Sequence, residues 1–224
     1  MPTSKDPQDE TRPPLSREAV LEAALWLASS EGLDGLSMRK LGRVLGVEAM
    51  SLYHHVGGKE DVLDGLADRI ASRIALPVPG QPWREGMRRR AHSARLVLGE
   101  HPWALSLLES RKHPGPASLR YYDAVLGCLR AGGFDVALAA HAFSLLDSYV
   151  YGFCLQESKL PLGEGGDLDE AARALGERMP EGELPHLAAM VEHTLRPGYD
   201  FGAEFEYGLE LILDGLERRL DSGA

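Results

Sequence analysis

The stretch LSMRKLGRVLGVEAMSLYHHVGGK, residues 36–59, supports the most specific prediction that the sequence allows. Ser37 can cap a helix because its hydroxyl accepts a free backbone N–H of the first turn, and Gly46 stands where a helix end favours a positive φ. A second, shorter helix is expected at about residues 48–55, before Gly57-Gly58. The apolar stripe of the first helix consists of Met38, Leu41, Val44 and Leu45. Two short helices joined by a glycine turn predict a helix-turn-helix.

The side chains of the second helix suit contact with DNA. The first residues of a recognition helix reach base edges, so Met50 is a candidate for a thymine methyl group and Ser51 for a hydrogen bond to a base. Candidates for phosphates, which position a protein without carrying sequence information, are Tyr53, His54, His55 and Lys59. Arg39 could reach either a phosphate or a guanine edge. The stretch has four cationic residues and one acidic residue, whereas the whole chain has a net charge of −10.

The composition predicts a globular protein of the cytoplasm. The chain has 224 residues, 44% of them hydrophobic, which is enough for a small domain and a medium-sized one. It has no run of 18 or more apolar residues, so we expect no membrane span, and its polar first residues lack the apolar segment of a secretion signal. Cys128 and Cys154 lie in separate apolar stretches and are expected to be small buried side chains.

Prolines divide the chain. Residues 1–14 hold four prolines and many charges without an apolar pattern, which predicts a disordered arm. The run LPVPGQP, residues 76–82, cannot continue a helix and separates residues 15–75 from residues 83–221. Helices are expected at residues 17–31, 59–75, 83–100, 117–131, 136–158, 168–179, 187–194 and 201–220. No segment alternates like a strand, so the predicted fold is all-α: an N-terminal three-helix helix-turn-helix domain with a connecting helix, then a larger helical bundle.

The N-terminal part resembles a known family. The run from Leu15 to Ile74 is similar to the DNA-binding domain of the tetracycline-repressor (TetR) family of bacterial transcription regulators, through LSREAVLEAALWLASSEGLDGLSMRKLGRVLGV and SLYHHVGGKEDVLDGL. The family's hallmark stands here as Leu52-Tyr53-His54-His55-Val56 followed by Lys59. The resemblance implies a regulator, in most members a repressor, that binds palindromic operator DNA and leaves it when a small-molecule effector binds.

A homodimer is expected, because operators read by helix-turn-helix proteins are usually two-fold and one chain has one recognition helix. The helix at 136–158 is apolar on nearly all faces, and the last helix has a stripe formed by Phe205, Leu209, Leu213 and Leu216. In the resembled family, these two helices of each subunit pack as a four-helix bundle. The same side chains could instead form the core of a single chain.

The resemblance also implies a pocket for an inducer in the larger domain. Candidates, which combine aromatic bulk with a few polar groups, are Trp103, Leu107, Tyr122, Phe143, Leu146, Asp147, Val150 and His193. Each of them taken singly also fits an ordinary core position. Asp147 is the most informative, because a carboxylate on an apolar helix must pair with a basic residue, meet a ligand or reach solvent.

The larger domain resembles that of the tetracycline repressors through YGFCLQES, residues 151–158, and the turn Gly132-Gly133-Phe134. Members of that type hold a magnesium–tetracycline complex with a histidine before the turn and a glutamate in the helix after it. Here Glu109 stands near the first position and Gln156, beside Glu157, near the second. We therefore expect an apolar or aromatic effector other than magnesium–tetracycline, and no cofactor or protein-bound metal.

Two other functions are weighed against this one. An architectural DNA-binding protein without an effector predicts a far more basic surface. A helical enzyme is the weakest hypothesis, because the one Glu-x-x-His, Glu183 to His186, contains Pro185 and the sequence has no phosphate loop or dinucleotide fingerprint. We interpret Arg88-Arg89-Arg90 as a solvated face. The favoured mechanism is a population shift, in which an effector moves the helix at 60–75 and changes the separation of the recognition helices.

Overall fold

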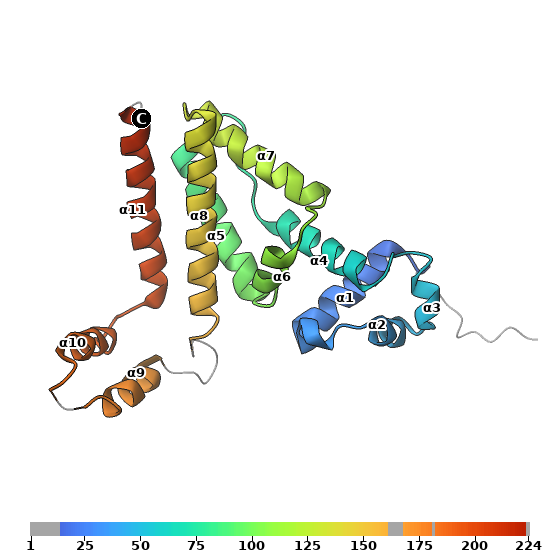
Figure 1. Cartoon of the computed structure of the whole chain (residues 1–224), viewed down its shortest axis with the longest axis horizontal. Coiled ribbons are helices and arrows are strands. Elements are labelled where there is room, and N and C mark those ends of the chain that lie inside the picture. Colours follow the sequence, from blue (N-terminus) through green and yellow to red (C-terminus); the bar gives the residue numbers. More distant parts are fainter. Residues whose placement is uncertain (1–13, 161–167, 181, 223–224) are drawn as a thin grey trace, which may run out of the picture.

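The computed structural model describes residues 14–160, 168–180 and 182–222 (Figure 1). Within these ranges every regular element is a helix, which confirms the predicted all-α fold. The arm expected at residues 1–14 falls almost wholly outside the described ranges.

The first helices follow the predicted limits closely. They are α1 (Arg17–Glu31), the 3-10 turn η1 (Leu33–Gly35), α2 (Met38–Leu45), α3 (Ala49–Leu52) and α4 (Lys59–Arg73). Ser16 caps α1 by accepting a hydrogen bond from the N–H of Ala19 (3.2 Å), and Ser37 caps α2 by accepting one from Lys40 (3.3 Å). These caps fix the starts of the two helices. A glycine follows the end of each helix, Gly32 after α1 and Gly46 after α2.

The turn between α2 and α3 brings their backbones together. A Cβ atom on Gly42 would lie 2.8 Å from the carbonyl oxygen of Val47, so only glycine fits at that position. Gly46 adopts the left-handed conformation, with φ at 64° and ψ at 37°. Leu41 and Leu52 are buried beneath the turn. The predicted helix-turn-helix is therefore a tightly packed unit.

Two details of this unit differ from the sequence prediction. α3 ends at Leu52 and not near His55, because the N–H groups of residues 53–55 bond carbonyls three residues back, which tightens the chain into a 3-10-like turn. Val44 is 41% exposed and does not belong to the buried stripe. α2 packs mainly against α1 and α3, and its residues Arg39, Arg43 and Val44 are exposed.

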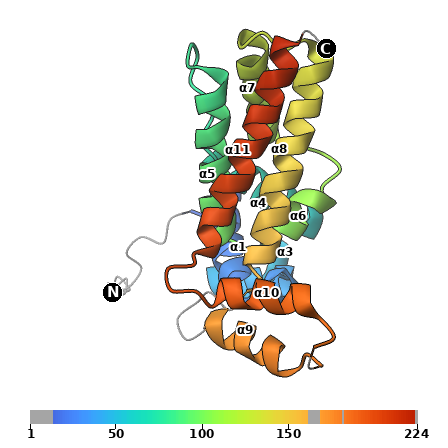
Figure 2. The same cartoon turned by 90° about the vertical axis from the view of Figure 1, so that its left-hand side faces the viewer.

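The remaining helices form a bundle. They are α5 (Trp83–Glu100), α6 (Ala104–Ser110), α7 (Pro116–Ala131), α8 (Val136–Glu157), α9 (Leu168–Glu177), α10 (Pro185–Thr194) and α11 (Phe201–Asp221). α8 packs against α5, α6, α7 and α11. α8 and α11 run side by side in opposite directions, and α9 and α10 form a pair near one end of them (Figures 1 and 2). α4 packs on both α1 and α7, so it joins the two groups of helices.

α8 leaves much of its apolar surface uncovered. By length and composition α8 could cross a membrane, since Asp147 and Glu157 are its only Asp, Glu, Lys or Arg residues. Within this chain, 33% of its most apolar window is buried. The exposed apolar side chains of α8 and α11 are Val136, Leu145, Leu155, Tyr207 and Leu211. The predicted dimer stripe of α11 was wrong, because Phe205, Leu209, Leu213 and Leu216 are buried within the chain. The opposite side of α11, which carries Tyr207 and Leu211, is exposed.

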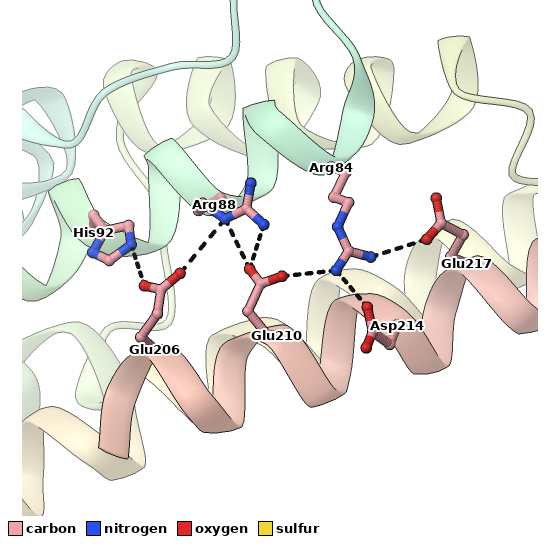
Figure 3. Close-up of polar contacts among 7 residues, drawn as sticks. All are labelled: Arg84, Arg88, His92, Glu206, Glu210, Asp214 and Glu217. Carbon is pink, nitrogen blue, oxygen red and sulfur yellow. Dashed lines mark hydrogen bonds and ion pairs between the residues drawn. The ribbon is translucent and has the colours of Figure 1, made fainter. Parts of the chain in front are cut away.

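A series of ion pairs holds α5 to α11, which we call the α5–α11 ladder and define as Arg84, Arg88, His92, Glu206, Glu210, Asp214 and Glu217 (Figure 3). Arg84 donates to Glu210 (2.7 Å), to Glu217 (3.1 Å) and to Asp214. Arg88 donates to Glu210 through Nε (2.8 Å), and His92 lies 2.8 Å from Glu206. The predicted solvated face of Arg88-Arg89-Arg90 was therefore wrong in part, since Arg88 is held by acids of α11 and Arg90 is buried.

Candidate DNA-binding and effector-binding sites

The predicted DNA contacts lie together on α2, α3 and the start of α4. Met50 on α3 is 73% exposed, and Tyr53 just after it is 50% exposed. Arg39, His54 and Lys59 are also exposed, and Ser51 is half-buried. We call these six residues the α2–α3 surface. The apolar core beneath it, which includes Leu52, holds the helices in place while the polar groups stay available.

The cations of the α2–α3 surface are free. Across residues 14–160, 168–180 and 182–222, the side chains of Arg39 and Lys59 make no hydrogen bond or ion pair, and neither does their neighbour Arg43. Lys40, on the same helix, is instead paired with Glu31 of α1. Unpaired cations on a rigid, exposed surface are available to neutralise phosphate. Arg43 was counted among the local charges but not among the predicted contacts, and its exposure adds it to the candidates.

A cleft of about 450 Å³ opens between α6, α7 and α8. We call it the α6–α8 cleft, and its lining consists of Leu108, Glu109, Tyr122, Phe143, Ser144, Asp147, Ser148 and Tyr151. The rings of Tyr122 and Phe143 meet edge to face, with centroids 5.6 Å apart. Burial raises the pKa of Tyr151, so its hydroxyl stays protonated and can donate a hydrogen bond. Aromatic walls with a few polar groups are typical of small-molecule sites.

The structure brings three of the eight predicted effector residues to this cleft: Tyr122, Phe143 and Asp147. Leu107, Leu146 and Val150 are fully buried in the core beside it. Trp103 is half-buried against His101, with ring centroids 5.6 Å apart. His193 lies in a separate cavity of about 600 Å³ between the end of α8, α9, α10 and the start of α11. The two cavities share no lining residue.

Several lining residues were missed in the sequence. Ser144, Asp147, Ser148 and Tyr151 follow the spacing i, i+3, i+4, i+7 on α8. Asp147 was predicted, so its helical neighbours could have been found by this spacing. Leu108 has no such signal, because its neighbour Leu107 faces the core and the sequence alone does not say which of the two does.

Asp147 pairs with a buried arginine, one of the three possibilities that the sequence left open. Its partner is Arg90 of α5, whose side chain is 1% exposed. Arg90 Nε also donates to the hydroxyl of Tyr121 on α7 (2.5 Å). The guanidinium carbon lies 5.0 Å from the ring centroid of Tyr121 and 5.6 Å from that of Phe143. The pair therefore ties α5, α7 and α8 together behind the cleft.

α4 is bound to the walls of the cleft by two sets of contacts. Asp68 of α4 accepts hydrogen bonds from the backbone N–H groups of Ala117 (3.1 Å) and Ser118 (2.8 Å) at the start of α7. Arg111, which directly follows α6, pairs with Glu60 (2.9 Å) and Asp64 (3.3 Å) of α4. These contacts connect α6 and α7 directly to α4, which begins at the α2–α3 surface.

Comparison with known proteins agrees with this architecture. The family described as "Bacterial regulatory proteins, tetR family" matches residues 20–66, and "Tetracyclin repressor-like, C-terminal domain" matches residues 76–220. The chain is 33% identical to the HTH-type transcriptional repressor DrrR1 of Streptomyces coeruleorubidus, over 96% of this chain and 82% of that protein. It is 32% identical to the class D tetracycline repressor from Escherichia coli, over 92% of this chain and 91% of the relative.

The fold is shared with a solved regulator. Apo ActR from Streptomyces coelicolor superposes with a TM-score of 0.79 at 28% sequence identity, covering 96% of this chain and 100% of that chain. A helix-turn-helix with free cations, joined through one helix to a bundle with an aromatic cleft, defines a DNA-binding regulator of transcription that responds to a ligand. The chain belongs to the tetR family of bacterial regulatory proteins. Proteins of this family bind operator DNA as dimers and respond to small-molecule effectors.

Proposed function

We propose that this protein represses transcription as a homodimer and leaves its palindromic operator when an effector occupies the α6–α8 cleft. The observation that carries the proposal is the chain of contacts from the cleft through Arg111 and Asp68 to α4. α4 starts at Lys59, on the α2–α3 surface. These contacts support the proposal because they connect the proposed effector site to the proposed DNA-binding surface.

The proposed DNA contacts fall into two sets. Met50 and Ser51 lie on α3 and are assigned to base edges in the major groove. Tyr53, His54 and Lys59 follow α3 and are assigned to phosphates, with Arg39 on α2 reaching either a phosphate or a guanine. The proposed dimer uses the exposed apolar sides of α8 and α11, which one chain leaves uncovered.

The proposed mechanism is a population shift. Without effector, the dimer holds its two α3 helices at the spacing of successive major grooves, about 34–36 Å. An effector that prefers another arrangement of α6 and α7 moves α4 and changes this spacing. It can alter operator affinity only by its own differential affinity for the two arrangements, commonly about 1–3 kcal/mol.

The proposed effector is aromatic and is not magnesium–tetracycline. The cleft is walled by Tyr122, Phe143 and Tyr151. Of the two positions that stand near the tetracycline ligands of the resembled type, Glu109 lines the α6–α8 cleft, whereas Gln156 lines the cavity around His193. ActR has also been solved in complex with actinorhodin, which bears on the size of effector that such a fold accepts. A rise in melting temperature with micromolar magnesium–tetracycline would contradict the exclusion.

The relatives of this chain are regulators, and we propose likewise that it has no enzymatic activity and acts in the cytoplasm, where it meets DNA. Fluorescence anisotropy on duplex DNA from upstream of its own gene, against scrambled DNA at physiological salt, tests the proposal. We expect the native sequence to bind more tightly and Tyr53→Ala to lose this tight binding.

The matched control is Arg219→Ala, which removes an exposed cation from the last turn of α11, away from α3 in Figure 1. It is expected to bind like the unmodified protein. If native and scrambled DNA bind equally, selection of bound genomic fragments decides whether an operator lies elsewhere. If the selection yields no preferred sequence, the proposal is contradicted. If no small molecule releases the protein from DNA, an architectural DNA-binding protein is favoured instead.

A further inference from the structure

Arg90 is a buried cation with spare hydrogen-bonding capacity. Its Nε donates to Tyr121 and its Nη2 pairs with Asp147, but its Nη1 has no hydrogen-bond partner among the residues that the structure describes. A buried donor left without a partner costs about 1–3 kcal/mol. Arginine cannot relieve this cost by losing its proton, because its pKa is too high. The guanidinium of Arg90 can therefore form one more hydrogen bond than the described residues provide.

The unsatisfied donor lies next to the α6–α8 cleft. Asp147, which holds Arg90, is itself part of the lining. Phe143, whose ring centroid is 5.6 Å from the guanidinium carbon, is another lining residue. A ligand that enters between Tyr122 and Phe143 therefore meets Phe143 and Asp147, the two lining residues that contact the guanidinium group. No other buried arginine or lysine occurs in the described part of the chain.

The charges around the cleft decide which kind of ligand group binds this N–H donor. Asp147 balances the single charge of Arg90, so the pair is neutral. Glu109, the other acid of the lining, is exposed, and water screens it from a group bound deep in the cleft. An ionised oxygen accepts a hydrogen bond from a guanidinium about twice as strongly as a neutral one does. The planar guanidinium also matches the planar geometry of a carboxylate.

We propose that the effector is an aromatic acid, whose carboxylate or phenolate oxygen binds Nη1 of Arg90 while its ring lies between Tyr122 and Phe143. This assignment rests on the proposed function and names the chemical class of its effector. Because Arg90 holds α7 through Tyr121 and α8 through Asp147, an acid that binds Nη1 and draws the guanidinium toward itself changes the contact between these helices. α7 is the helix that Asp68 of α4 caps, so the same event reaches α4.

Three probes of one shape test the proposal on the full-length protein: anthracene-2-carboxylate, its neutral carboxamide and the cationic 2-(aminomethyl)anthracene. Isothermal titration measures their affinities at neutral pH. We expect the carboxylate to bind about tenfold more tightly than the carboxamide, with the amine weakest. Equal affinities, tighter binding of the carboxamide or the amine, or no binding of the carboxylate at millimolar concentration would each overturn the proposal, since a water molecule would then suffice for Nη1.

The variant that isolates Arg90 is the double change Arg90→Met, Asp147→Leu, because apolar replacement of a buried ion pair is often neutral for stability. Circular dichroism confirms its fold. We expect this variant to lose the preference for the carboxylate and to retain binding of the carboxamide. Arg90→Lys, which keeps the charge but not the fork of donors, is expected to keep part of the preference. A double variant that still prefers the carboxylate would place the acid site elsewhere.

Failure here is distinguishable from failure of the proposed function. Operator binding is measured in the absence of any ligand. The result of that assay therefore does not depend on the charge of the effector. Release from the operator by a neutral or cationic compound would leave the repressor function intact and contradict only the acidic effector.

Discussion

The arginines of α5 and the arginines of α2 show how one residue type serves two purposes. On α5, Arg84 and Arg88 face acids of α11, Arg95 pairs with Glu157, and Arg90 is buried against Asp147. On α2, Arg39 and Arg43 face solvent, and no acid of the described chain meets them. The whole protein has a net charge of −10, yet these two cations lie on one short exposed helix without an acid partner among the described residues. Their position beside α3, together with this lack of an acid partner, makes them available to an external anion.

The largest expected effect comes from removing Arg90. Arg90→Met leaves the carboxylate of Asp147 in the interior without a counter-charge, which we expect to lower the free energy of unfolding by about 3 kcal/mol. Urea denaturation measures it. Arg39→Met is the matched change at a free arginine and is expected to cost less than about 0.5 kcal/mol. A similar loss of stability in both variants would contradict the distinction between the arginines of α5 and those of α2.

The reverse asymmetry is expected for DNA. Arg39→Ala should weaken operator binding by about tenfold, and if Arg39 contacts a phosphate it should lower the slope of log affinity against log salt by about one. Anisotropy titrations at four or more salt concentrations separate these outcomes. A loss of affinity with an unchanged slope would assign Arg39 to a guanine edge instead. An unchanged affinity would remove Arg39 from the interface.

A smaller effect is expected where the two regions meet. His101 lies 2.7 Å from Arg73 of α4 and 3.4 Å from Ser29 of α1, and its burial together with the charge of Arg73 lowers its pKa below 6.5. The unfolded chain therefore binds a proton more readily, and stability falls as the pH drops below about 6.5. Melting temperatures between pH 8 and pH 5.5 measure the loss. His101→Gln should flatten this part of the profile, and an unaltered profile would assign the loss to other groups.

The smallest effect is expected from the α5–α11 ladder. Its side chains are partly exposed, and pairs of this kind contribute about 0–1 kcal/mol each. Arg84→Gln should lower the free energy of unfolding by about 0.5 kcal/mol in dilute buffer and by less in 1 M salt. A cost near that of Arg90→Met would mean that the ladder, and not the apolar stripe beneath it, holds α11 in place.

The fold could be predicted from the sequence because its helix ends are local. Ser16, Ser37 and Asp135 accept hydrogen bonds as caps, and Gly46 ends α2 in the left-handed conformation. These signals act within four residues and need no knowledge of distant parts of the chain. α3 was predicted too long because its end depends on carbonyls three residues back, a choice that the apolar pattern does not record.

The candidate sites divide in the same way. The α2–α3 surface could be predicted, since exposure on a short amphipathic pair follows from spacing. The state of Arg90 could not, because its partners Tyr121 and Asp147 are 31 and 57 residues away and are brought to it by the packing of three helices. In the sequence, Arg90 is simply the third of three arginines. The stripe of α11 that the sequence assigned to a partner was misassigned for the same reason, because it packs within the chain.

The uncovered side of α8 ties the folding of the protein to its abundance. A subunit that keeps two-thirds of the most apolar window of α8 outside its own core gains stability by mass action when a second subunit covers it. Diluted subunits are then less stable as well as less able to reach both halves of an operator. A cell that makes few copies therefore holds less intact regulator than the copy number suggests, and dilution at each division acts on two equilibria at once.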